Sequence, residues 1–387
     1  MKPVLFNLSP AELEQFVLSL GQPKFRAKQI AEWLGRGAPD FSVMKNLPAD
    51  LRARIAETAD TLPCKIVKKL ESSDGQTTKF LLELNDGEQI ETVLMRTTYG
   101  NSVCVSSQAG CAMGCKFCAS TLLGLKRNLT ANEMIAQVLI ANWQLKQGQK
   151  DKRTKGQESR EMSICPSDHL SFTVPNGDAA KGDVSHIVVM GTGEPLQNLD
   201  NTTQFLEYAN QHLGISWRKI TVSTCGIVPG IEKLTEWGRP VNLAISLHAP
   251  NDELRGRLMP INAKYPLDKV LAAAFANSEK TGRQLMIEYI LLAAPKESEE
   301  RREKSADNCS LEHAEQLAGL LRGHEVMVNL IPWNAVDERD FKAPSGNAAH
   351  RFQDALIAAG IHTRIRRERG SDIGSACGQL RLGKKAS

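Results

Sequence analysis

From residue 102 onward, apolar strand-like segments alternate with helix-like segments, and this alternation constrains the fold more than any other feature. The predicted strands span 102–106, 186–190, 219–223, 241–247, 284–291, 325–331 and 361–366. The predicted helices lie near 130–145, 201–212, 229–237, 266–279, 311–322 and 346–358. Regular alternation with short connections predicts a parallel sheet, closed or partly closed into a barrel. We therefore expect an α/β fold, specifically a partial (β/α)6-type barrel.

The segments before this alternation have different patterns. Residues 1–60 have a helical pattern, in which Ser9 is placed to cap a first helix and Gly21 to end it. Residues 61–96 predict a β-hairpin, with strands at 78–84 and 90–95 around the Asn-Asp-Gly turn at 85–87. Glu91 lies in the second of these strands, where a glutamate usually faces solvent. Later, Thr130 and Glu133 have the spacing of a capping box.

One segment and the two ends of the chain complete the expected organisation. Residues 147–182 are polar, glycine-rich and highly charged, which predicts a mostly mobile insertion. We expect four parts: a helical domain at 1–60, a hairpin connector at 61–96, a core barrel at 97–340, and a final helix, strand and tail at 341–387. In the first part, Lys24, Arg26 and Lys28 beside Trp33 are consistent either with contacts to an RNA backbone or with an ordinary solvated basic face.

Composition excludes several classes of protein. The 387 residues are 41% apolar and 24% charged, with a net charge of +4 that hints only weakly at nucleic-acid binding. No basic start with an apolar core marks a secretory signal, and no run is long enough for a membrane helix. Nine cysteines, an odd number, suit a reducing cytoplasm better than a disulfide scaffold.

Three of those cysteines indicate a metal centre. Cys111, Cys115 and Cys118 have the spacing C-x3-C-x2-C. They lie in a loop in which Gly110 and Gly114 permit tight turns. Three thiolates fit a 4Fe-4S cluster whose fourth iron stays open, whereas most iron–sulfur proteins close all four irons with cysteine. An open iron can chelate the amino and carboxylate groups of S-adenosylmethionine. A structural zinc site that uses Cys104 as a fourth ligand is the alternative.

Polar residues follow the predicted strands at the edge where a parallel barrel gathers its chemistry. Gly191-Thr192-Gly193-Glu194-Pro195 follows one strand; its glycines let the backbone approach a ligand, and Glu194 is suited to pair with an ammonium group. Further strands end in hydroxyl, imidazole or amide groups that suit ribose, carboxylate or adenine contacts. These residues are Ser223, Ser246 with Leu247 and His248, and Asn334.

Five stretches together resemble the RlmN/Cfr family of radical-SAM RNA methyltransferases: 104–118, 191–195, 246–248, 331–334 and 374–380. The resemblance runs from the N-terminal helices to Cys377 and leaves out only 147–182. Thr192 stands where that family has methionine, a departure that leaves Gly193 and Glu194 in place. The resemblance implies a radical-SAM barrel, a small N-terminal RNA-binding accessory domain and a catalytic C-terminal tail.

The resemblance also implies roles for individual residues. Cys111, Cys115 and Cys118 would hold one 4Fe-4S cluster. S-adenosylmethionine, as methyl donor and radical source, would contact Gly193, Glu194, Ser223, Ser246, Leu247, His248 and Asn334. Cys377 would accept a methyl group and then form a covalent bond to the RNA base. Glu91 would accept the C2 proton, and Cys104 would release the product by forming a transient disulfide with Cys377.

The implied reaction is methylation of adenosine C2 in 23S rRNA and tRNA, at adenosines 2503 and 37 in the family. The resemblance further implies an electron donor such as flavodoxin, a monomer, no membrane and a cytoplasmic location. Cfr-like methylation at C8, a zinc-stabilised RNA-binding protein, and a radical-SAM enzyme for a small molecule remain alternatives. The region from Ile361 to the end has an excess of five positive charges (7 − 2), which predicts phosphate contacts. These charges are Arg364, Arg366, Arg367, Arg369, Arg381, Lys384 and Lys385 against Glu368 and Asp372.

Overall fold

The computed structural model describes residues 2–153, 182–293, 307–366 and 369–380. Within them, ten strands form one sheet in the order β1-β2-β3-β4-β7-β8-β9-β10-β11-β12. The parallel strands are β4 (Gly100–Cys104), β7 (Val184–Val189), β8 (Ile220–Thr224), β9 (Asn242–Ser246), β10 (Leu285–Leu291), β11 (Val326–Pro332) and β12 (His362–Ile365). Because β1 and β12 are both edges, the sheet is an open, partial barrel, as the alternation predicts.

Three antiparallel strands extend the sheet beyond β4: β1 (Cys64–Glu71), β2 (Thr77–Leu84) and β3 (Gln89–Thr97). The predicted hairpin is β2–β3. The sequence analysis missed β1, because this edge strand is exposed on both faces through most of its length and contains a bulge between Ile66 and Lys68. It therefore has no alternation of apolar and polar residues from which to predict a strand.

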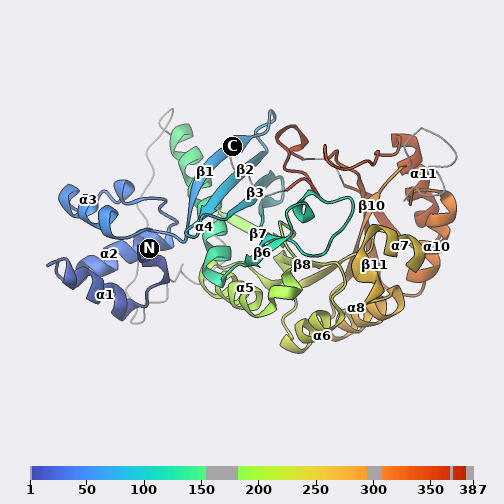
Figure 1. Ribbon diagram of the computed structural model, residues 1–387, viewed down its shortest axis with the longest axis horizontal. Helices are drawn as coiled ribbons and strands as arrows, with labels where there is room; N and C mark the ends of the chain where they lie inside the picture. The colour runs from blue at the N-terminus through green and yellow to red at the C-terminus, as the bar shows by residue number, and fades with distance from the viewer. Residues whose placement is uncertain (1, 154–181, 294–306, 367–368, 381–387) are drawn as a thin grey trace.

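Helices cover the outside of the sheet (Figure 1). They are α4 (Ala131–Arg153), α5 (Leu199–Leu213), α6 (Val228–Trp237), α7 (Asp252–Leu258), α8 (Leu267–Thr281), α10 (Leu311–Leu321) and α11 (Gly346–Ala358). The predicted capping box at Thr130 and Glu133 is present, with hydrogen bonds in both directions. Because α4 continues to Arg153, the segment expected to be a mobile insertion begins as helix, and 154–181 lie outside the described residues. The short helix α7 was also missed.

The N-terminal helices form a separate lobe beside α4, at one end of Figure 1. They are α1 (Pro10–Ser19), α2 (Phe25–Gly35) and α3 (Ala49–Thr58), and Ser9 caps α1 through a complete capping box. The lobe packs on the barrel through Trp33 against Trp143, with ring centroids 6.2 Å apart. No helix in the described part of the chain is long and apolar enough to cross a membrane.

A two-stranded ribbon, β5 (Gln108–Gly110) with β6 (Leu125–Asn128), holds the loop that carries the three cysteines. The ribbon closes tightly: a Cβ on Gly110, whose φ is +75°, would lie 1.9 Å from the carbonyl oxygen of Gly124. Glycine is therefore required at this position. The closed ribbon projects the loop over the carboxyl ends of the parallel strands, where Figure 1 shows it facing the C-terminal tail.

Candidate active site

A pocket lies at the carboxyl ends of strands β7 to β11, where the sequence predicts the chemistry. Its walls come from three places: the cysteine loop, the strand ends and the C-terminal tail. Of the thirteen predicted site residues, these line it directly: Cys111, Cys115, Cys118, Gly193, Glu194, Ser223, Ser246, His248 and Cys377. Leu247, Asn334, Glu91 and Cys104 do not line it, although each of the last three is linked to the tail, as described below.

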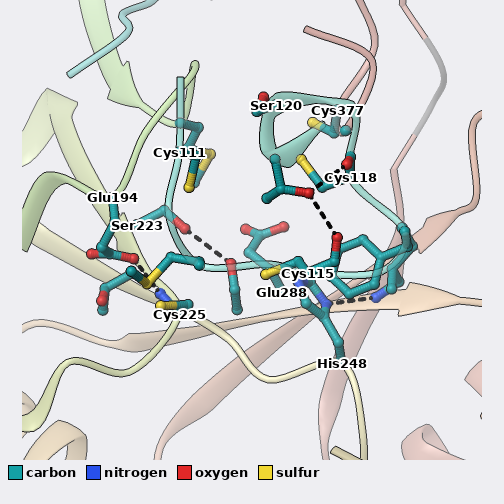
Figure 2. A pocket seen from close by; sticks show the side chains of 18 of the residues that line it. Cys111, Cys115, Cys118, Ser120, Glu194, Ser223, Cys225, His248, Glu288 and Cys377 are labelled. Atoms are coloured by element: carbon teal, nitrogen blue, oxygen red, sulfur yellow. Dashed lines mark hydrogen bonds between the residues drawn. The ribbon is translucent and has the colours of Figure 1, made fainter. Parts of the chain in front are cut away.

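The three cysteines of the loop share this pocket as free thiols (Figure 2). Burial raises the pKa of Cys111 to about 12 and that of Cys115 well above its ordinary value, and the neighbouring thiols raise both further. Thr121 and Arg339 order the loop: the Thr121 hydroxyl donates to the Cys118 carbonyl, and Arg339 donates to both residues. The three neighbouring thiols on this ordered loop resist ionisation on their own. They therefore suit a cationic metal group that binds them as thiolates.

The zinc alternative fits less well. In the described part of the chain, no three cysteine, histidine or carboxylate side chains converge closely enough to hold a single metal ion. Cys104, its expected fourth ligand, lies on β4, where the charges that act on its thiol are Cys377 and Arg366. A cluster of several irons spaces its thiolates more widely than one zinc ion does, so the cysteine loop suits a cluster better.

Glu194 anchors the end of β7. Its carboxylate is buried and accepts hydrogen bonds from the backbone N–H groups of Cys225 (2.8 Å) and Leu196 (3.1 Å). Burial raises the pKa of Glu194, although these hydrogen bonds oppose the shift. The carboxylate keeps lone pairs directed to the pocket, which suits a cationic ligand group. The adjacent glycines serve close packing within the chain: a Cβ on Gly193 would lie 2.6 Å from the Gln108 Cβ.

The next two strand ends meet as predicted. The hydroxyls of Ser223 and Ser246, from β8 and β9, lie 3.4 Å apart at the rim (Figure 2). His248 follows with φ +60°, an uncommon conformation for a non-glycine residue that points to a functional constraint. Its Nδ1 accepts a hydrogen bond from the Ile290 N–H, and burial lowers its pKa to about 3, so the ring is neutral. Leu247 is fully buried and contributes packing rather than pocket surface.

The tail folds back over the pocket instead of extending from the barrel. Its backbone pairs with the cysteine loop, since Ala119 N–H donates to the Gly378 carbonyl (2.8 Å) and the Ser120 hydroxyl donates to the Leu380 carbonyl (2.6 Å). The Asn334 side chain donates to the carbonyl of Cys377 (3.0 Å). These contacts place the exposed Cys377 thiol in the pocket on the side of Cys118 (Figure 2).

Two further predicted residues lie on the sheet beneath the tail. Glu91 is buried, not solvent-facing as expected for a strand glutamate, and it forms an ion pair with Lys79 at 2.9 Å. Cys104 pairs across the strands with Val93, which lies two residues from Glu91 on the same face of β3. Burial raises the pKa of Cys104 to about 12, and the Cys377 thiol raises it too, while Arg366 opposes the shift. The fold thus brings Glu91, Cys104 and Cys377 to one region.

Sequence reasoning missed a charged group at the floor of the pocket. Glu288 on β10 is buried; one carboxylate oxygen accepts from Asn329 (2.7 Å) and the other pairs with Arg366 (3.3 Å). The signal was available, because Glu288 interrupts an otherwise apolar strand. The missed Arg255 on α7 is fully buried and donates to the backbone carbonyls of Leu247 and Cys225, which fixes two strand ends.

Several of the basic residues considered for phosphate or RNA contacts have partners within the chain. Arg366 faces the pocket and Glu288, and the Cys377 thiol and Glu288 raise its pKa, so it is a pocket residue. Arg364 donates to the Asn329 side chain. In the N-terminal lobe, Lys24 pairs with Glu14, and Arg26 donates to the Gln29 side chain. The positions 367, 381, 384 and 385 lie outside the described residues.

The chain is similar to known proteins over nearly its whole length. Residues 4–61 match the ribosomal RNA large subunit methyltransferase N-terminal domain, and residues 177–309 match the radical SAM superfamily. A probable dual-specificity RNA methyltransferase RlmN from Geobacillus thermodenitrificans is 45% identical, over 98% of this chain and 93% of that protein. The corresponding protein from Alkaliphilus oremlandii is 42% identical, over 97% of both. Among solved structures, a radical SAM methyltransferase from Sphaerobacter thermophilus superposes with a TM-score of 0.77 at 38% identity, covering 98% and 99% of the two chains.

Proposed function

This chain belongs to the RlmN family within the radical-SAM superfamily, and we propose that it methylates C2 of an adenosine in 23S rRNA and in tRNA. The two relatives are described as dual-specificity RNA methyltransferases and align over nearly the whole chain. The observation that carries the proposal is the seating of the tail. It brings Cys377 into the pocket of the cysteine loop, above the sheet face that holds Cys104 and Glu91.

The proposed cofactors are one 4Fe-4S cluster, held by Cys111, Cys115 and Cys118, and S-adenosylmethionine. When bound, the cluster supplies the electron that cleaves S-adenosylmethionine and makes an unreactive carbon accessible to radical chemistry. Glu194 is placed to receive the ammonium of the methionine moiety. The Ser223 and Ser246 hydroxyls and the backbone from Gly193 to Glu194 offer further polar contacts along the same rim.

Cys377 is the proposed methyl acceptor, because its exposed thiol reaches the pocket while its backbone is fixed by Asn334. Attack on a methyl sulfonium requires the thiolate. The Arg366 guanidinium, oriented by Glu288, lies close enough for mutual electrostatic stabilisation with that thiolate. Methyl transfer forms a carbon–sulfur bond at Cys377 and releases S-adenosylhomocysteine.

Glu91 and Cys104 are the proposed residues for product release. Glu91 takes the proton from C2 of the base that is bonded to Cys377, and its place beneath the tail excludes bulk water. The Cys104 thiol loses its proton and its sulfur attacks the Cys377 sulfur. A disulfide forms, the electron pair of the broken carbon–sulfur bond goes to the methylene carbon attached to C2, and a proton completes the methyl group. The raised pKa of Cys104 keeps it a protonated thiol until that step, and Arg366 favours its ionised form.

The N-terminal lobe is the proposed RNA-binding accessory domain, in agreement with its match to a methyltransferase N-terminal domain. The proposed division otherwise follows the four parts expected from the sequence. An electron donor such as flavodoxin belongs to the proposal, as does activity as a monomer. Methylation at adenine C8 uses the same kinds of residues, so it is the second candidate for the position modified.

The test is nucleoside mass spectrometry. Anaerobically reconstituted protein receives S-adenosylmethionine, a reductant, and unmodified 23S rRNA fragment or tRNA. We expect 2-methyladenosine, which is lost in Cys377→Ala although the iron content is retained. The appearance of 8-methyladenosine would change the position modified and leave the rest standing. If iron-loaded protein forms neither of these nucleosides, the RNA assignment is contradicted.

A second test concerns Cys104. In Cys104→Ala we expect the protein–RNA adduct to persist, because no thiol remains to attack the Cys377 sulfur. The adduct appears as a shifted band on a denaturing gel, and it is absent in the double variant that also lacks Cys377. An active Cys104→Ala enzyme that leaves no adduct would exclude the resolving role.

A further inference from the structure

Lys79 on β2 has an unusual environment for a lysine. Only 11% of its side chain is exposed, and its ammonium makes two short contacts. One is with the carboxylate of Glu91, at 2.9 Å, and the other is with the backbone carbonyl of Gly374, also at 2.9 Å. A buried ammonium is retained only where such partners offset its loss of hydration. These contacts connect the sheet directly to the tail.

The register of the sheet explains the first contact. Leu81 lies opposite Glu91, and Lys79 lies opposite Val93, so Lys79 and Glu91 are diagonal neighbours on one face of the β2–β3 pair. Cys104 lies opposite Val93 on the next strand and shares that face. The pleat alone therefore places an ammonium, a carboxylate and a thiol on the surface that the tail covers.

The second contact lies at a bend in the tail. Gly370 (φ +64°) and Gly374 (φ +59°) flank the single turn η7 (Ser371–Ile373), and both adopt the left-handed conformation. Within this turn, the Asp372 carboxylate accepts a hydrogen bond from Ser73 N–H at 2.9 Å. After it, the chain leaves the sheet and reaches Cys377. Lys79 holds the carbonyl of Gly374, three residues before Cys377.

We propose that Lys79 is a positioning residue that orients Glu91 and seats the tail that carries Cys377. A single ammonium holds both groups, so the proton acceptor is aligned when the tail is in place. The link between Lys79 and proton transfer rests on the proposed function. The link between Lys79 and the seating of the tail rests only on the two contacts.

Three substitutions separate the two contacts. Lys79→Met keeps the aliphatic stem and removes both. Lys79→Gln keeps a donor for the Gly374 carbonyl, one atom shorter, and removes the charge that faces Glu91. Lys79→Arg keeps both a donor and the charge, and serves as the conservative rescue. Lys65→Met is the matched control, because Lys65 forms an exposed ion pair with Glu83 across the neighbouring β1–β2 pair.

The first readout is the rate at which iodoacetamide alkylates Cys377, followed by peptide mass spectrometry on iron-loaded protein. We expect Lys79→Met to raise this alkylation rate at least about fivefold, because the tail opens more often. Lys79→Gln, Lys79→Arg and Lys65→Met should stay within about twofold of the wild type. An unchanged rate in Lys79→Met would overturn the seating role, and this readout does not depend on RNA methylation.

The second readout is the lifetime of the protein–RNA adduct in chains that retain Cys104. We expect Lys79→Gln to prolong it about tenfold, because misplacement of a catalytic group by a fraction of an ångström has costs of this size. Lys79→Arg should restore the wild-type lifetime. If Cys104→Ala traps an adduct but Lys79→Gln resolves it normally, the link to Glu91 is wrong and the proposed function stands. If Cys104→Ala stays active and traps none while Lys79→Met alters alkylation, the proposed release step fails and the seating role stands.

Discussion

Gly193 offers the sharpest test of how the strand-end loop supports the pocket. Its φ of +113° is a conformation that side-chain-bearing residues rarely adopt. A Cβ at this position would lie 2.6 Å from the Gln108 Cβ and 2.8 Å from the Gln108 backbone nitrogen. Because one of those contacts is backbone, no side-chain rotation relieves the overlap. The substitution Gly193→Ala must therefore displace the loop that carries Glu194.

The expected cost has two parts. The unfavourable φ contributes about 1–2 kcal/mol to the loss of folding free energy. Relief of the overlap adds about 1–3 kcal/mol, which is the usual cost of overpacking. Glu194 is hydrogen-bonded through Cys225 N–H and Leu196 N–H, so a shift of the loop also moves its carboxylate. We expect the affinity for S-adenosylmethionine to fall at least about tenfold, which corresponds to about 1.4 kcal/mol.

The assay compares two glycines. Gly282 also has positive φ, +62°, but a Cβ there meets nothing within 4 Å, so Gly282→Ala isolates the conformational cost. Urea unfolding gives the loss of stability, and equilibrium dialysis of iron-loaded protein gives the affinity for S-adenosylmethionine. Gly282→Ala should destabilise by the conformational cost alone, about 1–2 kcal/mol, and bind S-adenosylmethionine normally. The reasoning is refuted if Gly193→Ala is no less stable than Gly282→Ala and binds S-adenosylmethionine within twofold of the wild type.

Three further perturbations test other parts of the structure. Arg255→Met should reduce the free energy of unfolding by about 3–5 kcal/mol, because it removes a fully buried charge and leaves buried carbonyls unpaired; the exposed control Arg257→Met should cost less than about 0.5 kcal/mol in the same urea titration. Burial raises the pKa of Cys64 from 9.0 to about 12, so the unfolded chain loses this proton first and stability declines as pH rises above 9. Urea titrations at pH 8 and 10 should therefore show a loss that is about 1 kcal/mol smaller in Cys64→Ala than in the wild type, and equal losses would contradict this account. Arg366→Met should reduce the free energy of unfolding by about 1–3 kcal/mol, because it leaves the buried Glu288 carboxylate without its cationic partner; a urea titration equal to that of the wild type would show that this ion pair does not stabilise the pocket.

The sequence predicted those parts of the fold that depend on local pattern. Parallel strands buried on both faces are nearly continuous apolar runs, and β10 and β11 were placed within a residue or two for this reason. Helix ends were predictable where a cap or a left-handed glycine marks them, as at Ser9 and Gly21 for α1. The edge strand β1 and the short helix α7 have neither signal.

Much of the candidate site depends on register and on packing between distant segments. Glu91 resembles a surface residue in the sequence of β3, yet it is buried and paired with Lys79, which also contacts the tail. In the sequence, Lys79 resembles any other polar residue of a half-exposed strand. Its role becomes visible only from the strand register, which makes it the diagonal neighbour of Glu91. Arg366 belongs to a run of basic residues that suggests phosphate contacts, yet Glu288 from another strand turns it into the pocket. Charge patterns along the chain therefore cannot distinguish a surface cation from one that serves a site.

The tail and the cysteine loop stabilise each other, and this has a thermodynamic consequence. Ala119 and Ser120 on the loop hold the carbonyls of Gly378 and Leu380, while Lys79 holds the carbonyl of Gly374 from the opposite side. Cys377 lies between these fixed points. A ligand that orders the loop therefore favours the seated tail, and by reciprocity a seated tail strengthens binding of that ligand. The two walls of the pocket that do not come from the sheet, the cysteine loop and the tail, are therefore coupled. When the loop is ordered, the Cys377 thiol is held in the pocket.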